Sequence, residues 1–151
     1  MLQKILINVV KELDKNKIPY AIIGGQASLM HGVVRFTQDI DIVLGIAIDE
    51  INKFQKLISK LNFEYLVENP EDFAKLTRVM PVYEKESNIK IDFIFSFTDF
   101  ERNAIENSII KEFKNTQIHF CSAEDLIIFK IFAGRELDIF DVKNIFLRSR
   151  C

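Results

Sequence analysis

The chain has 151 residues, of which 48% are hydrophobic and 28% are charged, and its net charge is −2. This length supports one domain over residues 1–151 with a hydrophobic core of its own. The slightly negative charge excludes a general electrostatic attraction to nucleic acid, so we expect no non-specific nucleic-acid binding.

The small number of cysteines and the lack of long apolar runs indicate a cytoplasmic protein. Only two cysteines are present, Cys121 and Cys151, and neither has metal-site spacing, which favours free thiols in a reducing compartment. No apolar run approaches the length of a membrane span, so we expect no membrane partner. The first 18 residues lack the uninterrupted apolar region of a signal peptide.

Apolar residues from Leu2 to Leu13 recur at three- and four-residue steps, which predicts an amphipathic helix that ends at Asn16-Lys17. A short apolar strand, Tyr20–Ile23, should follow. Gly24-Gly25 then predicts a tight turn before a helix of small residues over Gln26–His31.

The remaining elements are predicted in chain order from periodicity and turn residues. We expect a strand over Asp39–Leu44, a helix from Ile48 or Asp49, a brief strand over Phe63–Val67, a short helix that begins near Pro70, paired strands over Leu76–Tyr83 and Ile89–Phe95, a helix over Phe100–Ser108, extended segments over Ile109–Phe113 and Gln117–Phe120, a helix capped by Ser122 and ended by Gly134, and a last helix from Glu136 whose end frays after Arg148. This order indicates an α/β (α+β) fold with a small mixed β-sheet and helices packed mainly on one face. We expect the many phenylalanines to lie in the core.

Three aspartates are candidates for metal ligands. Asp39 and Asp41 are two positions apart, so on one strand they share a face with Cα atoms roughly 7 Å apart. Neighbouring carboxylates repel each other unless a cation lies between them. Asp92 is a single acid in the otherwise apolar strand Ile89–Phe95, and pairing with Lys90 or Arg78 on an exposed face is the alternative interpretation of it.

The spacing of these motifs resembles the nucleotidyltransferase superfamily of DNA polymerase β. Its signature is Gly-Gly or Gly-Ser, then roughly a dozen residues, then acid–apolar–acid, and a later strand acid; here these are Gly24-Gly25, Asp39-Ile40-Asp41 and Asp92. Within it the chain is similar to small prokaryotic nucleotidyltransferases of the AbiE-type toxin group. That closer likeness is carried by Ser28, His31, Arg35, Thr37, and the tail segment with Lys130, Arg135, Asp138 and Asp141.

The resemblance implies an enzyme that moves a nucleoside monophosphate from an NTP to a hydroxyl acceptor on protein or RNA, with Mg²⁺ or Mn²⁺ as cofactor. Asp39, Asp41 and Asp92 would be catalytic and bind the metal. The residues that would hold the NTP are Gly24, Gly25, Ser28, Arg35, Thr37, Lys130 and Arg135. Any of the three cations, Arg35, Lys130 or Arg135, could neutralise the triphosphate charge. A toxin-like role would imply an antitoxin protein as partner.

Several plainer interpretations stay open. His31 is more typical of a packed or capping histidine than of a ligand, and Lys130 can extend its charge from a helix face to solvent. Asp138 and Asp141 should pair with Arg135 or Lys130 and orient them. A small-molecule nucleotidyltransferase of the aminoglycoside type, and a non-catalytic binding protein with this fold, are the alternative functions.

Overall fold

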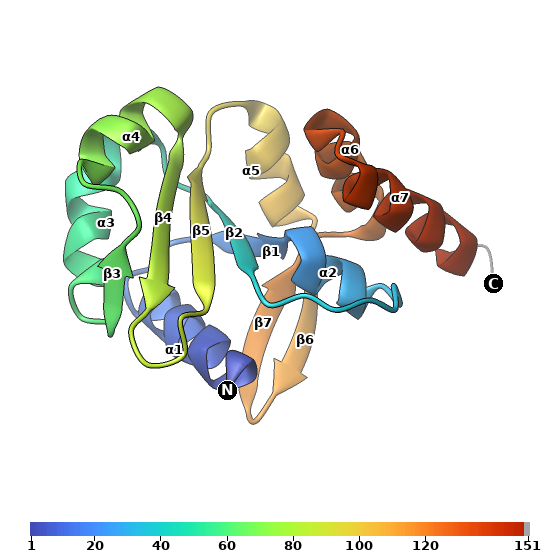
Figure 1. Cartoon of the computed structure of the whole chain (residues 1–151), viewed down its shortest axis with the longest axis horizontal. Coiled ribbons are helices and arrows are strands. Elements are labelled where there is room, and N and C mark those ends of the chain that lie inside the picture. Colours follow the sequence, from blue (N-terminus) through green and yellow to red (C-terminus); the bar gives the residue numbers. More distant parts are fainter. Residues whose placement is uncertain (150–151) are drawn as a thin grey trace.

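The computed structural model describes residues 1–149, which form one mixed sheet surrounded by helices (Figure 1). The strands, in chain order, are β1 Tyr20–Ile23, β2 Ile40–Leu44, β3 Phe63–Tyr65, β4 Val79–Glu84, β5 Lys90–Phe95, β6 Ile109–Phe113 and β7 Thr116–Phe120. The helices are α1 Leu2–Lys15, α2 Gly24–Met30, α3 Ile51–Ile58 after a 3-10 turn η1 at Ile48–Glu50, α4 Pro70–Thr77, α5 Asp99–Glu106, α6 Ala123–Ala133 and α7 Glu136–Ser149. The predicted mixed α/β class is confirmed.

The sheet has seven strands among the described residues, in the order β3-β4-β5-β2-β1-β7-β6. The central strand β2 is antiparallel to β1 and parallel to β5, and β1 is parallel to β7. A parallel pair needs a long crossover. The connection from β2 to β5 therefore contains α3, β3, α4 and β4, and it brings two distant acidic segments of the chain side by side.

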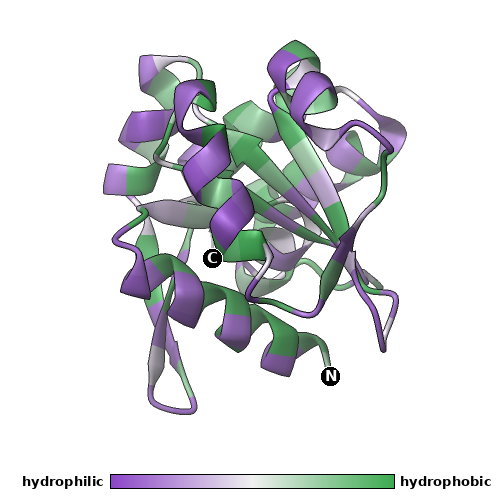
Figure 2. Ribbon diagram, turned by 90° about the vertical axis from the view of Figure 1, so that its left-hand side faces the viewer, coloured by the Kyte–Doolittle hydropathy of each residue, from purple (hydrophilic) through white to green (hydrophobic). Residues whose placement is uncertain are grey.

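Strand alternation fixes which side of the central strands is buried. Ile40 and Ile42 of β2 and Phe93 of β5 have no exposed surface. Phe93 and Phe95 pack edge-to-face against Phe54 of α3, with ring centroids 4.9 and 5.6 Å away. Figure 2 shows these hydrophobic strands enclosed by helices that alternate between hydrophobic and hydrophilic turns. Residues one position out of phase, including Asp41 and Asp92, therefore face the opposite side of the sheet.

Four predicted strand starts differ from the structure: by one residue for the strands that begin at Ile40, Lys90 and Thr116, and by three for the strand that begins at Val79. The strand expected from Leu76 begins at Val79, because α4 continues to Thr77 and ends at Arg78, which has the left-handed φ of 67° and donates its backbone N–H to Ala74. Alternation over so short a stretch does not distinguish the last helical turn from a strand. The strand expected from Asp39 begins at Ile40, so Asp39 lies just before it.

The glycine pair also differs slightly from the prediction. Gly24 and Gly25 form the first turn of α2 rather than a separate turn before it. The capping and stop signals further on are confirmed: the Ser122 hydroxyl accepts from the backbone N–H of Asp125, and Gly134 ends α6 at a left-handed φ of 67°. At the chain end, where fraying after Arg148 is expected, Ser149 still belongs to α7, and Arg150 and Cys151 lie outside the described residues.

The expectation that the phenylalanines are core residues is wrong for part of the set. Phe36, Phe97 and Phe132 are 81%, 65% and 84% exposed. The Phe97 ring instead lies 4.4 Å from the Arg78 guanidinium carbon, a cation–π contact at the surface. In residues 1–149 no helix is both long enough and apolar enough to cross a membrane.

Candidate active site

Parallel pairing of β2 with β5 sets Asp41 directly opposite Asp92. Side chains at matched positions of neighbouring strands point to the same face of a sheet, so the two carboxylates lie next to each other. Asp39 precedes β2 and lines the same cavity of about 380 Å³. The structure thus brings the three sequence-predicted aspartates together on the face opposite the phenylalanine core.

Burial and mutual repulsion act on these acids. Desolvation, followed by the charges of Asp92 and Asp39, raises the pKa of Asp41 from 3.8 to about 6. Lys90 and Arg135 partly oppose this rise. Lys90 lies beside Asp92, with its Nζ 3.4 Å from Oδ2, so the plainer pairing predicted for Asp92 is present in addition to its place in the cavity.

The two glycines allow the start of α2 to approach the acids closely. Gly24 has a φ of +66°, and a Cβ there would overlap the Asp41 carboxylate. A Cβ at Gly25 would lie 2.5 Å from the Thr37 hydroxyl and 3.0 Å from Nη2 of Arg35. Only glycine satisfies both the backbone conformation and the lack of space at position 24. Both glycines, Arg35 and Thr37 line the cavity that holds the acids.

Behind the cavity, the buried carboxylate of Asp141 joins distant parts of the chain. It accepts from Nε and Nη2 of Arg35 at 2.7 and 2.8 Å, and the Nζ of Lys130 lies 2.6 Å away. Burial would raise the pKa of Asp141, but the hydrogen bonds and charges of Arg35 and Lys130 lower it below its ordinary value. The loop before Asp39 is thereby fastened to α6 and α7.

A second ion pair completes this group. Asp138 accepts from the backbone N–H and the guanidinium of Arg135, and Lys130 lies 3.6 Å from it. The predicted pairing of Asp138 and Asp141 with these cations is therefore present. Lys130 does not extend to solvent, because its side chain is only 4% exposed, whereas that of Arg135 is 74% exposed.

Ser28 and His31, like Asp141, were named from the sequence and lie outside the cavity lining. Ser28 is fully buried, and its hydroxyl donates to the backbone carbonyl of Gly24 and to Asp141. His31 contacts the backbone carbonyl of Cys121 through Nε2 at 2.7 Å, the packed position expected of it. In this structure Ser28 therefore supports the turn and the Asp141 ion cluster from behind.

Lys90 is the site residue that sequence reasoning did not select. It lines the cavity with Asp92 because the two are separated by one residue on β5 and share a face. Strand alternation would have placed it there. Other contributors, such as Phe129 and Leu137, come from α6 and α7 and depend on tertiary packing that no short motif encodes.

The chemistry of the acids suits a hard divalent cation. Carboxylate oxygens are the ligands that Mg²⁺ and Mn²⁺ prefer, and a cation between the acids would relieve the repulsion that raises the pKa of Asp41. Within residues 1–149 no group of three His, Cys, Asp or Glu side chains is already arranged closely enough to hold a metal. The donor set fits such a cation in its chemistry, and coordination would need the carboxylates to come closer together than they lie in this structure.

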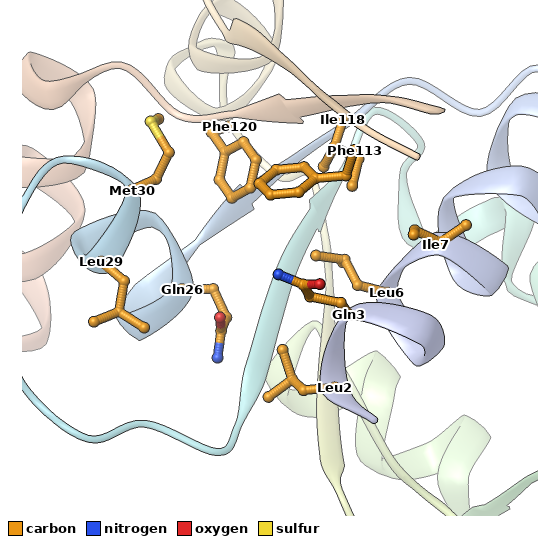
Figure 3. Close-up of a pocket in the computed structure, with 10 residues that line it drawn as sticks. All are labelled: Leu2, Gln3, Leu6, Ile7, Gln26, Leu29, Met30, Phe113, Ile118 and Phe120. Atoms are coloured by element: carbon orange, nitrogen blue, oxygen red, sulfur yellow. The ribbon is translucent and has the colours of Figure 1, made fainter. Parts of the chain in front are cut away.

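A separate cavity of about 260 Å³ lies between α1, α2 and the β6–β7 hairpin (Figure 3). Its wall is mostly apolar, with Leu2, Leu29 and Phe113 pointing into it and Gln3 and Gln26 as polar members. None of its lining residues is charged. It therefore lacks the groups needed to bind a metal or a triphosphate, and the acidic cavity is the candidate active site.

Comparison with known proteins identifies the family of this chain. The model of a family described as "Nucleotidyltransferase of unknown function (DUF6036)" matches residues 2–151. No curated protein sequence matches the chain.

Solved structures with a similar fold include three nucleotidyltransferase-like proteins. The lincosamide antibiotic adenylyltransferase LnuA, with lincomycin bound, is 19% identical with a TM-score of 0.63, over 94% of each chain. An antigenic nucleotidyltransferase-like protein from Paracoccidioides brasiliensis is 16% identical with a TM-score of 0.65, over 95% of this chain and 74% of the other. ANT(2'')-Ia in complex with adenylyl-2''-tobramycin is 14% identical with a TM-score of 0.60, over 95% and 87%. At these identities the likeness shows the fold alone.

The close approach at Gly24 predicts a position-specific loss of stability. Gly24→Ala should lower the free energy of unfolding by about 1 kcal/mol for the left-handed backbone and by a further 1–3 kcal/mol for the clash with Asp41. Gly134→Ala is the matched control, because φ is +67° there but the nearest atom to an added Cβ is 3.6 Å away. Urea unfolding measures both, and equal losses would contradict the close approach.

The raised pKa of Asp41 predicts that the metal-free protein becomes more stable when this charge is removed. The native carboxyl keeps its proton up to about pH 6, so the stability gained from protonation is full below 3.8 and lost as the pH rises to 6. Asp41→Asn should therefore raise the free energy of unfolding by about 1–3 kcal/mol above pH 6, with the gain developing between pH 4 and 6. Thermal unfolding in chelator across this range is the measurement. A gain that does not vary with pH would show that Asp41 is not desolvated.

Proposed function

Because the chain belongs to the DUF6036 family of nucleotidyltransferases, we propose that it transfers a nucleoside monophosphate from an NTP to a hydroxyl acceptor, with Mg²⁺ or Mn²⁺ bound by Asp39, Asp41 and Asp92. One observation carries the proposal: Asp41 and Asp92 come from different strands yet are paired in register. Asp39 and the Gly24-Gly25 turn line the same cavity.

The residues divide the reaction between two sides of the cavity. Gly24, Gly25 and Thr37 form the wall beside Asp41, where the triphosphate would lie. Asp92 lies on the far side of Asp41 from these glycines, because β2 separates β5 from β1. This position suits it to orient the acceptor hydroxyl and take its proton as the new oxygen–phosphorus bond forms and pyrophosphate leaves. Bound divalent metal would neutralise charge on the α-phosphate and the leaving group and lower the pKa of the acceptor hydroxyl.

The three candidate cations take different roles in this proposal. Arg135 is the cation for the triphosphate: it also bonds Asp138, but its side chain is 74% exposed at the cavity, against 14% for Arg35 and 4% for Lys130, and its charge acts on Asp41. Arg35 and Lys130 are already bonded to the buried Asp141. They are better suited to hold the loop and α6 in place than to leave that carboxylate for a phosphate.

The acceptor class is open between a hydroxyl on a protein or RNA and a hydroxyl on a small molecule. The resemblance to AbiE-type toxins supports the first class and an antitoxin partner. The shared fold with adenylyltransferases whose structures hold lincomycin or adenylyl-2''-tobramycin supports the second. Both classes use the same metal-assisted transfer.

Labelled nucleotide tests the proposal directly. Purified protein with each α-labelled NTP, Mg²⁺ or Mn²⁺ and a cell extract should transfer label, and with NTP alone it should release pyrophosphate slowly to water. Asp92→Asn should reduce both rates about 100-fold or more, since it removes a group that acts on the reacting atoms.

The matched control is Asp99→Asn on α5, whose side chain is 89% exposed and pairs only with Arg102 in the described structure. This variant should keep the wild-type rates. Absence of metal-dependent pyrophosphate release from the wild type, or equal rates in Asp92→Asn and Asp99→Asn, would exclude the proposed function.

A further inference from the structure

A further cavity, called the second cavity below, adjoins the acidic cavity of the candidate active site at Asp92 and Lys90. This cavity, of about 360 Å³, lies between α4, the segment after β3, and β4. Asp92 and Lys90 line both cavities. Anything bound in the second cavity would therefore reach the acid proposed to take the acceptor proton, from the side opposite the glycines.

Sheet register explains why the two cavities meet. Asp41 pairs with Asp92 across β2 and β5, and Asp92 pairs with Pro81 across β5 and β4. Residues in such a row share one face of the sheet, so the reactive face continues past Asp92 onto β4. Pro81 lies beyond the end of the short pairing with β3, which spans Val82 to Glu84, and the backbone N–H of Leu66 donates to its carbonyl at 3.0 Å.

The wall beyond Asp92 is uncharged. It consists of Leu66, Val67, Phe73, Thr77, Val79 and Pro81, with Thr77 as its polar side chain. Leu66 and Phe73 are 46% and 36% exposed, so they present apolar surface to a ligand. The charged lining is limited to Asp92 and Lys90, which are paired with each other at 3.4 Å.

We infer that this second cavity is the acceptor subsite and that it selects a small, hydroxyl-bearing organic molecule with an apolar face. The inference rests on the proposed function and specifies its substrate class. A polycationic acceptor would need several acids to offset the desolvation of its charges, and this lining offers one acid that already has a lysine beside it. A nucleic-acid end would need several cations for its phosphates, and the lining offers one.

The size of the subsite agrees with a small molecule. Sites for such ligands are mostly apolar concavities of about 300–1,000 Å³ with a few polar groups that fix orientation. Here Asp92 is that polar group, and it orients the acceptor hydroxyl toward the acidic cavity, where the NTP would bind. The transfer forms a phosphodiester between that hydroxyl oxygen and the α-phosphorus, and it breaks the bond from the α-phosphorus to the oxygen that bridges it to the β-phosphorus. Pyrophosphate leaves, and the hydroxyl proton passes to Asp92.

Fractionated acceptors test the subsite. Wild-type protein, α-labelled NTPs and metal are incubated separately with the low-mass part of a cell extract retained on a reverse-phase resin, its polar flow-through supplemented with tobramycin, total RNA, and total protein. Label is expected in the retained, apolar fraction. Label that appears only in the flow-through, RNA or protein overturns the inference.

Two variants test whether the apolar wall of the second cavity contacts the acceptor. Phe73→Ala should raise the KM for the labelled apolar acceptor about tenfold, because it removes apolar contact area, and leave the KM for NTP unchanged. Leu76→Ala is the control on the same helix, since Leu76 is 85% exposed and is not part of the lining. Equal acceptor KM values for the two variants overturn the inference.

Pyrophosphate release from NTP alone distinguishes a failure of the acceptor subsite from a failure of the proposed reaction. Release that no acceptor fraction stimulates leaves the proposed chemistry standing and overturns the subsite. No metal-dependent release at all excludes the proposed function, and this inference fails with it.

Discussion

The fold holds two like charges beside each other at a partly desolvated position. The carboxylates of Asp41 and Asp92 are kept adjacent by the backbone pairing of β2 with β5. Ile40, Ile42 and Phe93, on the opposite face, are fully buried. A slip of one residue would expose that apolar set and bury the acids in the core, so the hydrophobic face enforces the register that the acids themselves oppose.

This arrangement divides the work between the two sides of one sheet. The buried side supplies the free energy of folding through apolar contacts such as those of Phe54. The other side carries the acids, whose repulsion costs part of that free energy until a cation is present. Active sites commonly contain unfavourable charge–charge interactions of this kind. Here the raised pKa of Asp41 reflects both its desolvation and its repulsion by Asp92 and Asp39.

Features set by local spacing could be predicted from the sequence. The glycine pair, the Asp39–Asp41 spacing and the alternation around Asp92 were sufficient to name the candidate acids and to place Asp41 and Asp92 on strands, whereas Asp39 lies just before β2. Boundaries failed where a short pattern fits two structures, as at Leu76, which belongs to α4. The nucleotidyltransferase assignment came from resemblance, and the family match supports it at the superfamily level.

Tertiary relations could not be predicted in the same way. The burial of Ser28, the bonding of Arg35 to Asp141 and the withdrawal of Lys130 from solvent depend on packing between segments far apart in sequence. The apolar cavity beside Asp92 likewise combines α4, β4 and β5. No regular sequence spacing connects its lining residues, because they come together only when the helix and strands that carry them pack against one another.

The bond between Arg35 and Asp141 also has a consequence for biosynthesis. The two residues are 106 positions apart, and Asp141 lies on α7, which follows every strand of the sheet. While the ribosome is still adding residues before α7, the loop that leads to Asp39 has no carboxylate to anchor its arginine. The arrangement of Arg35 described above therefore cannot form until α7 has been synthesised and packed against the rest of the chain.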